Sequence, residues 1–207
     1  MRIQPEAELF RNKALGPPDF SDDMTNLIAR QAQLIETNVN WLRQAITLIG
    51  SIADGAFTMS PQGMEPHRAG AHLRHILEFY ECFLDGVESG HIDYDARRRD
   101  HLLERSRTAA IEKMRSMINR LQTTRGLSGD SVVFVRMEDV EAGELPDPFL
   151  LTSVARELQA LSSHTIHHFA LMAMTLRLHG CEVNRDFGMA PSTLRFRSQG
   201  GNKAAAA

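Results

Sequence analysis

The chain has 207 residues, 43% of them hydrophobic and 24% charged, with a net charge of −3 and a pI of about 6.3. This composition is typical of a globular domain that needs no disulfide framework, and it lacks the basic excess of a nucleic-acid-binding domain. No apolar run approaches the ~20 residues of a membrane span, and the N-terminus has no apolar signal-peptide core. We therefore expect a soluble, cytoplasmic protein with no nucleic-acid and no membrane partner.

The first half of the chain contains two helical patterns. Residues 1–22, with Pro5, Pro17 and Pro18, are expected to form an irregular lead-in. Apolar residues at three- and four-residue spacing then predict one helix over 23–50 and a second over 68–87. Residues 90–104 are polar and irregular, and this segment is long enough to connect one end of a helical bundle to the other.

The second half repeats this pattern after an interruption. A third helix is predicted over 105–123, and residues 126–149 combine the β-branched VVFVR with turn residues, which indicates a short β-hairpin or extended excursion. A fourth helix is predicted over 151–179, with Thr152 or Ser153 as its cap. Residues 181–207 form a tail whose GGNKAAAA end we expect to be disordered.

Four amphipathic helices must bury their apolar stripes against one another, and a bundle is the simplest way to do so. The sequence therefore predicts an all-α protein in which residues 23–180 form a four-helix bundle, with the short hairpin before the fourth helix. Small bundles with apolar flanks often pair, so we expect a homodimer.

The placement of the histidines is the most informative feature of the sequence. His164 and His168 are four residues apart and therefore project from one face of the fourth helix. His167 lies ~100° from His168 around the helix and cannot easily share the same centre. On the second helix, His72 and His75 lie near one face, and a ligand from there would complete a three-histidine site with open positions.

This pattern favours one divalent metal ion, with zinc, nickel or iron as candidates, in the core of the bundle. Which of His72 and His75 is the ligand stays open at this point. His167 and Glu157 could orient a ligand ring from outside, and Arg74, Arg156 or Tyr80 could orient an anionic substrate. The chain lacks the HExxH motif of zinc proteases, and a di-iron site would need inward Glu-x-x-His pairs. A bundle that binds no metal and buries its histidines as polar core groups is a further alternative.

The segments AGAHLRHILEFYECFLDG and SSHTIHHFALM, together with the helix order and the tail FGMAPST, resemble the DinB-like superfamily, which includes the YfiT-like proteins. The resemblance runs from the first helix to the fourth. It implies an up-down-down-up bundle with a long crossover between the second and third helices. It also implies that a single second-helix histidine joins the HxxxH pair around the ion, and carried over to this chain these residues are His75, His164 and His168.

The resemblance also bears on function, and a second function is weighed beside the one it implies. Members of the superfamily include transferases that use a low-molecular-weight thiol of the bacillithiol or mycothiol type. The first expectation is therefore a metal-dependent thiol S-transferase, or a hydrolase, acting on a small-molecule substrate. The second is a non-catalytic or stress-related bundle protein in which the ion has a structural or sensing role.

Overall fold

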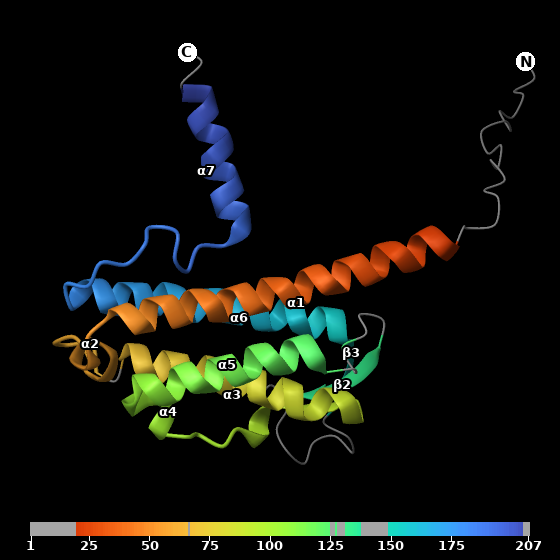
Figure 1. Cartoon of the computed structure of the whole chain (residues 1–207), viewed down its shortest axis with the longest axis horizontal. Coiled ribbons are helices and arrows are strands. Elements are labelled where there is room, and N and C mark those ends of the chain that lie inside the picture. The colour runs from red at the N-terminus through yellow and green to blue at the C-terminus, as the bar shows by residue number, and fades with distance from the viewer. Residues whose placement is uncertain (1–19, 66, 125–126, 128–130, 138–148, 205–207) are drawn as a thin grey trace, which may run out of the picture.

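The protein is mostly helical, with a small three-stranded sheet near one end of the long helices (Figure 1). This is a computed structural model, in which the described residues are 20–65, 67–124, 127, 131–137 and 149–204. The predicted lead-in therefore lies almost wholly outside the described residues. In the described part, no helix is long and apolar enough to cross a membrane.

Four long helices lie side by side: α1 (Phe20–Ser51), α3 (Ala69–Gly86), α5 (Arg107–Thr123) and α6 (Val154–Leu178). Helices α1 and α3 each pack against both α5 and α6. Helices α1 and α6 run in one direction and α3 and α5 in the opposite one (Figure 1). The four helices predicted from periodicity are thus present, with boundaries that differ by at most three residues. A short helix, α2 (Asp54–Thr58), follows α1.

The predicted crossover between the second and third long helices is present, but it is more ordered than the sequence indicated. It contains a 3-10 turn at Val87–Ser89, strand β1 (His91–Asp93), a second 3-10 turn at Tyr94–Ala96 and helix α4 (Leu102–Arg105). Glycines at the two ends of α3 let it approach the backbone closely. A Cβ atom on Gly86 would lie 2.2 Å from the His91 carbonyl oxygen, and one on Gly70 would lie 2.3 Å from that of Glu104. The crossover therefore runs back along α3, and α5 starts at the same end as α3.

The sheet confirms one prediction and corrects another. Strand β2 (Val132–Arg136) and strand β3 (Leu150–Ser153) pair antiparallel, as expected for a hairpin before the fourth helix. However, β1 joins them by pairing parallel with β2, with His91 opposite Phe134. The mostly helical architecture with a hairpin agrees with the expectation, but the third strand, β1, was not predicted. Three residues are too few for an alternating pattern to stand out from polar sequence.

Apolar side chains from all four long helices form the core. The stripe predicted on α3 is buried, and α6 contributes Leu158, Leu161, Phe169, Met172 and Leu176. The N-terminal part of α1 projects beyond the other helices, and Ile28 there is exposed (Figure 1). Helix α7 (Pro191–Ala204) lies in the tail, where no helix was predicted. Disorder was expected for the GGNKAAAA end, residues 200–207; residues 200–204 instead belong to α7, and residues 205–207 lie outside the described residues.

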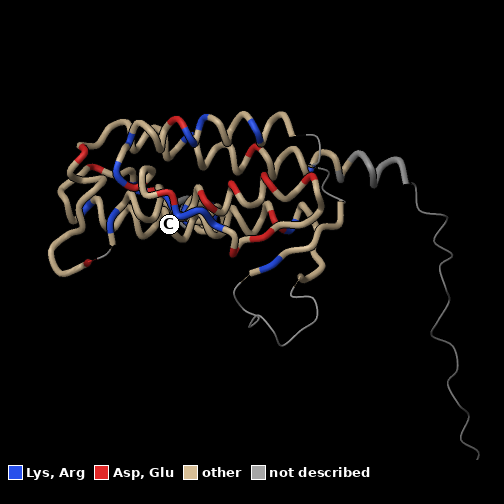
Figure 2. The backbone as a smooth tube through the Cα atoms, turned by 90° about the horizontal axis from the view of Figure 1, so that it is seen from below, with Lys and Arg blue, Asp and Glu red and all other residues tan. Residues whose placement is uncertain are grey.

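Acidic and basic residues are interspersed along the described backbone (Figure 2). Several of them pair between elements, as in Lys113 of α5 with Glu81 of α3, and Arg120 of α5 with Asp85 of α3. Such exposed or half-exposed pairs each contribute little to stability, but together they fix the neighbouring helices in register.

Candidate metal site

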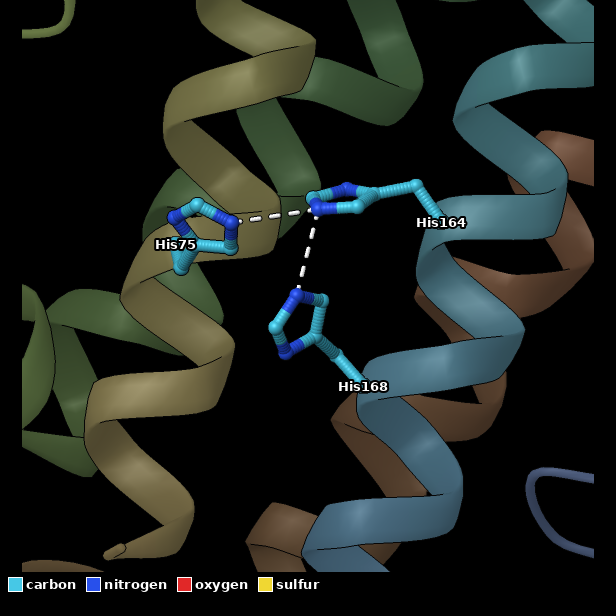
Figure 3. Close-up of side chains that lie close together, drawn as sticks. All are labelled: His75, His164 and His168. Atoms are coloured by element: carbon cyan, nitrogen blue, oxygen red, sulfur yellow. Dashed lines mark hydrogen bonds between the residues drawn. The ribbon is translucent and has the colours of Figure 1, made fainter.

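Three histidine side chains point toward one another across the contact between α3 and α6 (Figure 3). His75 comes from α3, and His164 and His168 come from successive turns of α6. Helix α6 begins after Ser153, whose hydroxyl oxygen accepts a 3.3 Å hydrogen bond from the backbone N–H of Arg156. This is one of the two caps that the sequence predicted, and it fixes where α6 begins.

The ring nitrogens of the triad converge on one point. The Nε2 atom of His164 lies 3.1 Å from Nε2 of His75 and 3.1 Å from Nε2 of His168. One ligand nitrogen from each of the three residues lies within 4.8 Å of those of the other two. The rings themselves meet edge to face, with centroids 4.6 to 4.9 Å apart. All three side chains are half-buried.

The surroundings keep two of these imidazoles neutral, those of His164 and His168. Burial, together with the neighbouring His75, lowers the pKa of His164 from 6.5 to about 4. Burial and the adjacent His164 lower the pKa of His168 to about 3. A neutral imidazole carries a free lone pair on one nitrogen, and that lone pair is what a metal ion requires. At neutral pH His164 and His168 therefore already have the protonation state of metal ligands.

The spacing of the nitrogens fits a metal ion. With metal–nitrogen bonds of about 2.0–2.1 Å, a tetrahedral ion holds its ligand nitrogens about 3.4 Å apart. Two of the three Nε2 separations are 3.1 Å, so an ion would need only a slight opening of the triad. Without an ion, the His164 Nε2 atom lies close to two other nitrogens at once. A neutral ring nitrogen has either one proton or one lone pair, so it can form a hydrogen bond with only one of them. The donor set therefore matches a single divalent ion with three imidazole ligands.

The structure separates the two histidines of α3. His75, not His72, supplies the nitrogen that converges with His164 and His168. His72 lies one turn earlier, and its Nδ1 atom is 3.1 Å from the outer nitrogen, Nδ1, of His168. Exposed His67 stacks on the His72 ring, with centroids 5.8 Å apart. His72 therefore contacts the triad from outside.

His167 and Glu157, the two residues predicted to orient a ligand ring from outside, lie in different places. His167 is exposed, and its ring lies edge to face with that of His168 at 5.1 Å. Glu157 is buried, but it accepts hydrogen bonds from the Tyr94 hydroxyl at 3.0 Å and the Thr152 hydroxyl at 2.9 Å. Two helical turns, about 10.5 Å of rise, separate Glu157 from His164, which is too far for a hydrogen bond.

Of the three residues expected to orient an anionic substrate, one lines a cavity. Arg74 forms a 2.8 Å ion pair with buried Glu104 of α4, so it fastens the crossover. Tyr80 is fully buried and donates a 2.7 Å hydrogen bond to Asn38 of α1. Arg156 is exposed and lines a cavity of about 310 Å³ beside the sheet. Arg74 and Tyr80 therefore have structural roles.

Aromatic and cationic neighbours of the triad were missed by the sequence reasoning. The Phe79 ring lies 4.2 Å from that of His164, and Tyr94 of the crossover stacks on Phe79 at 5.1 Å. The Arg97 guanidinium lies 4.8 Å above the same Phe79 ring. Phe79 is four residues after His75 on α3, so helical spacing could have placed it here. Tyr94 and Arg97 reach the site only through the path of the crossover, which no local pattern specifies.

Comparison with known proteins gives little further guidance. No family model matches the chain, and no solved structure matches it. Among curated proteins, FK506-binding protein 5 of Rhizopus delemar is 32% identical over 105 residues. That match covers 50% of this chain but only 27% of the fungal protein. A match of this extent does not establish a family, so the histidine triad carries the functional argument.

Proposed function

We propose that this chain is a DinB-like protein that binds one divalent metal ion through His75, His164 and His168. The observation that carries this proposal is the convergence of three imidazoles from two helices, two of them held neutral by burial. The helix order, the antiparallel and parallel helix directions and the long crossover also agree with the family that the sequence resembles. Three imidazoles leave coordination positions free, which is the arrangement of a reactive rather than a closed site.

We further propose that the ion activates a low-molecular-weight thiol for transfer to an electrophilic small molecule. A bound divalent ion lowers the pKa of a coordinated thiol, so that the thiolate is available near neutral pH. The thiol loses its proton to solvent, the sulfur forms a bond to an electrophilic carbon, and the leaving group departs with its electron pair. The chain's own part in this reaction is to hold the ion in the half-buried seam and to orient the substrate.

The cavity beside the sheet offers a place for the organic part of the substrate. Its lining includes Ala160, which lies one turn before His164 and near the same face of α6. Apolar walls come from strands β2 and β3, and Arg156 supplies a positive charge at its edge. Pockets of this kind bind small molecules through apolar contacts and a few polar groups that fix orientation. An anionic group on the substrate would pair with Arg156.

A second function is supported by the position of the triad between two helices. Since His75 belongs to α3 and the other two histidines to α6, an ion would tie these helices together. A purely structural or sensing ion would do the same without accepting a thiol. The two functions therefore differ in whether the ion has a position open to an added ligand.

Elemental analysis of the chain purified without an affinity tag tests the shared part of both proposals. We expect one divalent ion per chain, and a content near zero in His164→Ala, with an unchanged far-ultraviolet circular dichroism spectrum. Cobalt(II) replacement then separates the two. A thiolate-to-cobalt charge-transfer band on adding thiol supports the transferase, whereas an unchanged spectrum supports the structural ion. An ion content unaffected by His164→Ala would overturn both.

A further inference from the structure

His168 is held from two sides. Its Nε2 atom faces the triad, 3.1 Å from Nε2 of His164. Its Nδ1 atom faces the opposite way and lies 3.1 Å from Nδ1 of His72 on α3. The rings of His72 and His168 are tilted by 41°, with centroids 5.3 Å apart. The His168 ring thus stands between His72 and the point on which the triad converges.

These contacts couple the tautomer of His168 to that of His72. A neutral imidazole has one donor and one acceptor nitrogen, and the bond made by one fixes the role of the other. If His168 presents the Nε2 lone pair to an ion, its proton is on Nδ1 and is donated to Nδ1 of His72. His72 then carries its own proton on Nε2, a buried atom that has no hydrogen-bond partner among the described residues.

We propose that His72 is a positioning residue, which fixes the tautomer and the ring orientation of His168 rather than binding the ion as a fourth ligand. This inference rests on the metal site proposed above. The His168 ring separates the Nδ1 atom of His72 from the converging Nε2 atoms, so His72 cannot reach the ion from its present position. Ligand histidines commonly donate their outer N–H to a carboxylate or carbonyl oxygen, and here a neutral imidazole takes that place.

The neutral partner has a chemical consequence. A carboxylate bonded to the outer N–H makes a ligand imidazole more basic and therefore a stronger electron donor. A neutral imidazole does so less, which leaves more of the positive charge on the ion. An ion that retains its charge polarises a bound thiol or water more strongly. The His72–His168 pair therefore favours a reactive ion over a tightly neutralised one.

The position on the other side of His168 provides a matched control. His167 is also adjacent to the His168 ring, at 5.1 Å, but it is exposed and meets that ring edge to face. A substitution of His167 changes the charge and the volume near His168 without removing the Nδ1 contact. Loss of affinity that is specific to His72 would therefore identify the hydrogen bond as its cause.

The test measures zinc affinity of the full-length chain by competition with a chromophoric chelator, and the cobalt(II) absorption spectrum. We expect His72→Leu to bind zinc about 10- to 100-fold more weakly, at one ion per chain, with an altered cobalt spectrum. His72→Gln, whose amide oxygen can accept from Nδ1–H, should recover most of the affinity, and His167→Gln should match the parent. Unchanged affinity in His72→Leu would overturn the inference. So would complete loss, as in His75→Ala, since that result would identify a ligand.

A measurement on the metal-free chain keeps the inference separate from the metal site. Imidazole nitrogen NMR reports the tautomer of each neutral histidine. We expect His168 to carry its proton on Nδ1 in the parent and to lose that preference in His72→Leu. If the parent protein binds no zinc, the proposed metal site is refuted. If the parent binds zinc but its metal-free form carries the His168 proton on Nε2, only the role of His72 is refuted.

Discussion

The hydroxyl group of Tyr80 donates a 2.7 Å hydrogen bond to the side-chain oxygen of Asn38, and both residues are fully buried. The amide nitrogen of Asn38 in turn donates to the backbone carbonyl of Leu158 at 3.0 Å. This pair joins α1, α3 and α6 through polar groups in an otherwise apolar core. Buried polar groups that are fully paired favour one arrangement of the helices over others.

Substitution of Asn38 by leucine should destabilise the protein. The change leaves the Tyr80 O–H without its acceptor and removes the side-chain donor to the Leu158 carbonyl, which keeps its place in α6; a buried donor left unpaired costs about 1–3 kcal/mol. Urea unfolding followed by circular dichroism measures the loss. Thr37→Ala, which removes an exposed hydroxyl bonded to its own helix, serves as the control and should change the unfolding free energy little. Equal stability of the two variants would contradict this account of the core.

Alanine at Gly86 should destabilise the protein and alanine at Gly50 should not. The added Cβ at position 86 would lie 2.2 Å from the His91 carbonyl oxygen, so β1 would have to move, at a cost of about 1–3 kcal/mol. Gly50, in α1, has no atom within 4 Å of the added Cβ, and alanine there should stabilise by about 0.5–1 kcal/mol. Thermal unfolding of the two variants checks the opposite signs. A similar melting temperature for both variants would show that the crossover backbone is not closely packed against α3 at Gly86.

The metal-free protein should lose stability as the pH falls from about 7 to about 5. Burial lowers the pKa of His164 to about 4 and that of His168 to about 3, whereas both return to about 6.5 on unfolding. Between these values the unfolded chain binds more protons than the folded one, so a falling pH favours unfolding. Urea unfolding at several pH values should show a smaller dependence in His168→Gln than in the parent. An identical slope in the two proteins would contradict the prediction.

Removal of the proposed ion should lower the melting temperature. An ion that binds only the folded chain adds about 2.7 kcal/mol of stability when its free concentration is 100 times the dissociation constant. Differential scanning calorimetry with zinc and with chelator should therefore give two midpoints for the parent. His75→Ala should give one midpoint under both conditions, close to that of the chelated parent. A zinc effect of the same size in His75→Ala would place the ion elsewhere.

Filling the cavity beside the sheet should separate thiol binding from ion binding. Tryptophan at Ala160, which lines this cavity one turn before His164, would fill the cavity without altering a proposed ligand. We expect Ala160→Trp to weaken the thiol-induced change in the cobalt spectrum several-fold and to leave zinc affinity unchanged. Gln159→Trp adds the same side chain to a neighbouring, exposed position on α6. If both variants respond to thiol as the parent does, the substrate lies elsewhere.

Much of the helical framework could be predicted from the sequence, because each long helix carries its apolar stripe in consecutive turns. The pairing of His164 with His168 followed from helix geometry in the same way. Two aspects did not follow. Helix geometry left the choice between His75 and His72 open, because i and i+3 residues share a face and the outcome depends on the rotation of α3 against α6; only the family resemblance named His75. Strand β1 depends on pairing with residues more than forty positions later, which no local signal encodes.

The parallel pairing of β1 with β2 also bears on how the protein opens. The chain leaves the sheet after Asp93 and returns at Val132, so α4 and α5 lie in a loop that the two strands close at its base. Helix α5 is also packed against α1 and α3. Large outward movement of α5 therefore disturbs the strand pair as well as the helix contacts. We therefore expect the amide protons of α5 and of the central strand, β2, to exchange slowly and at similar rates, because the two elements would open as one cooperative unit. The N-terminal end of α1 should exchange independently of this unit.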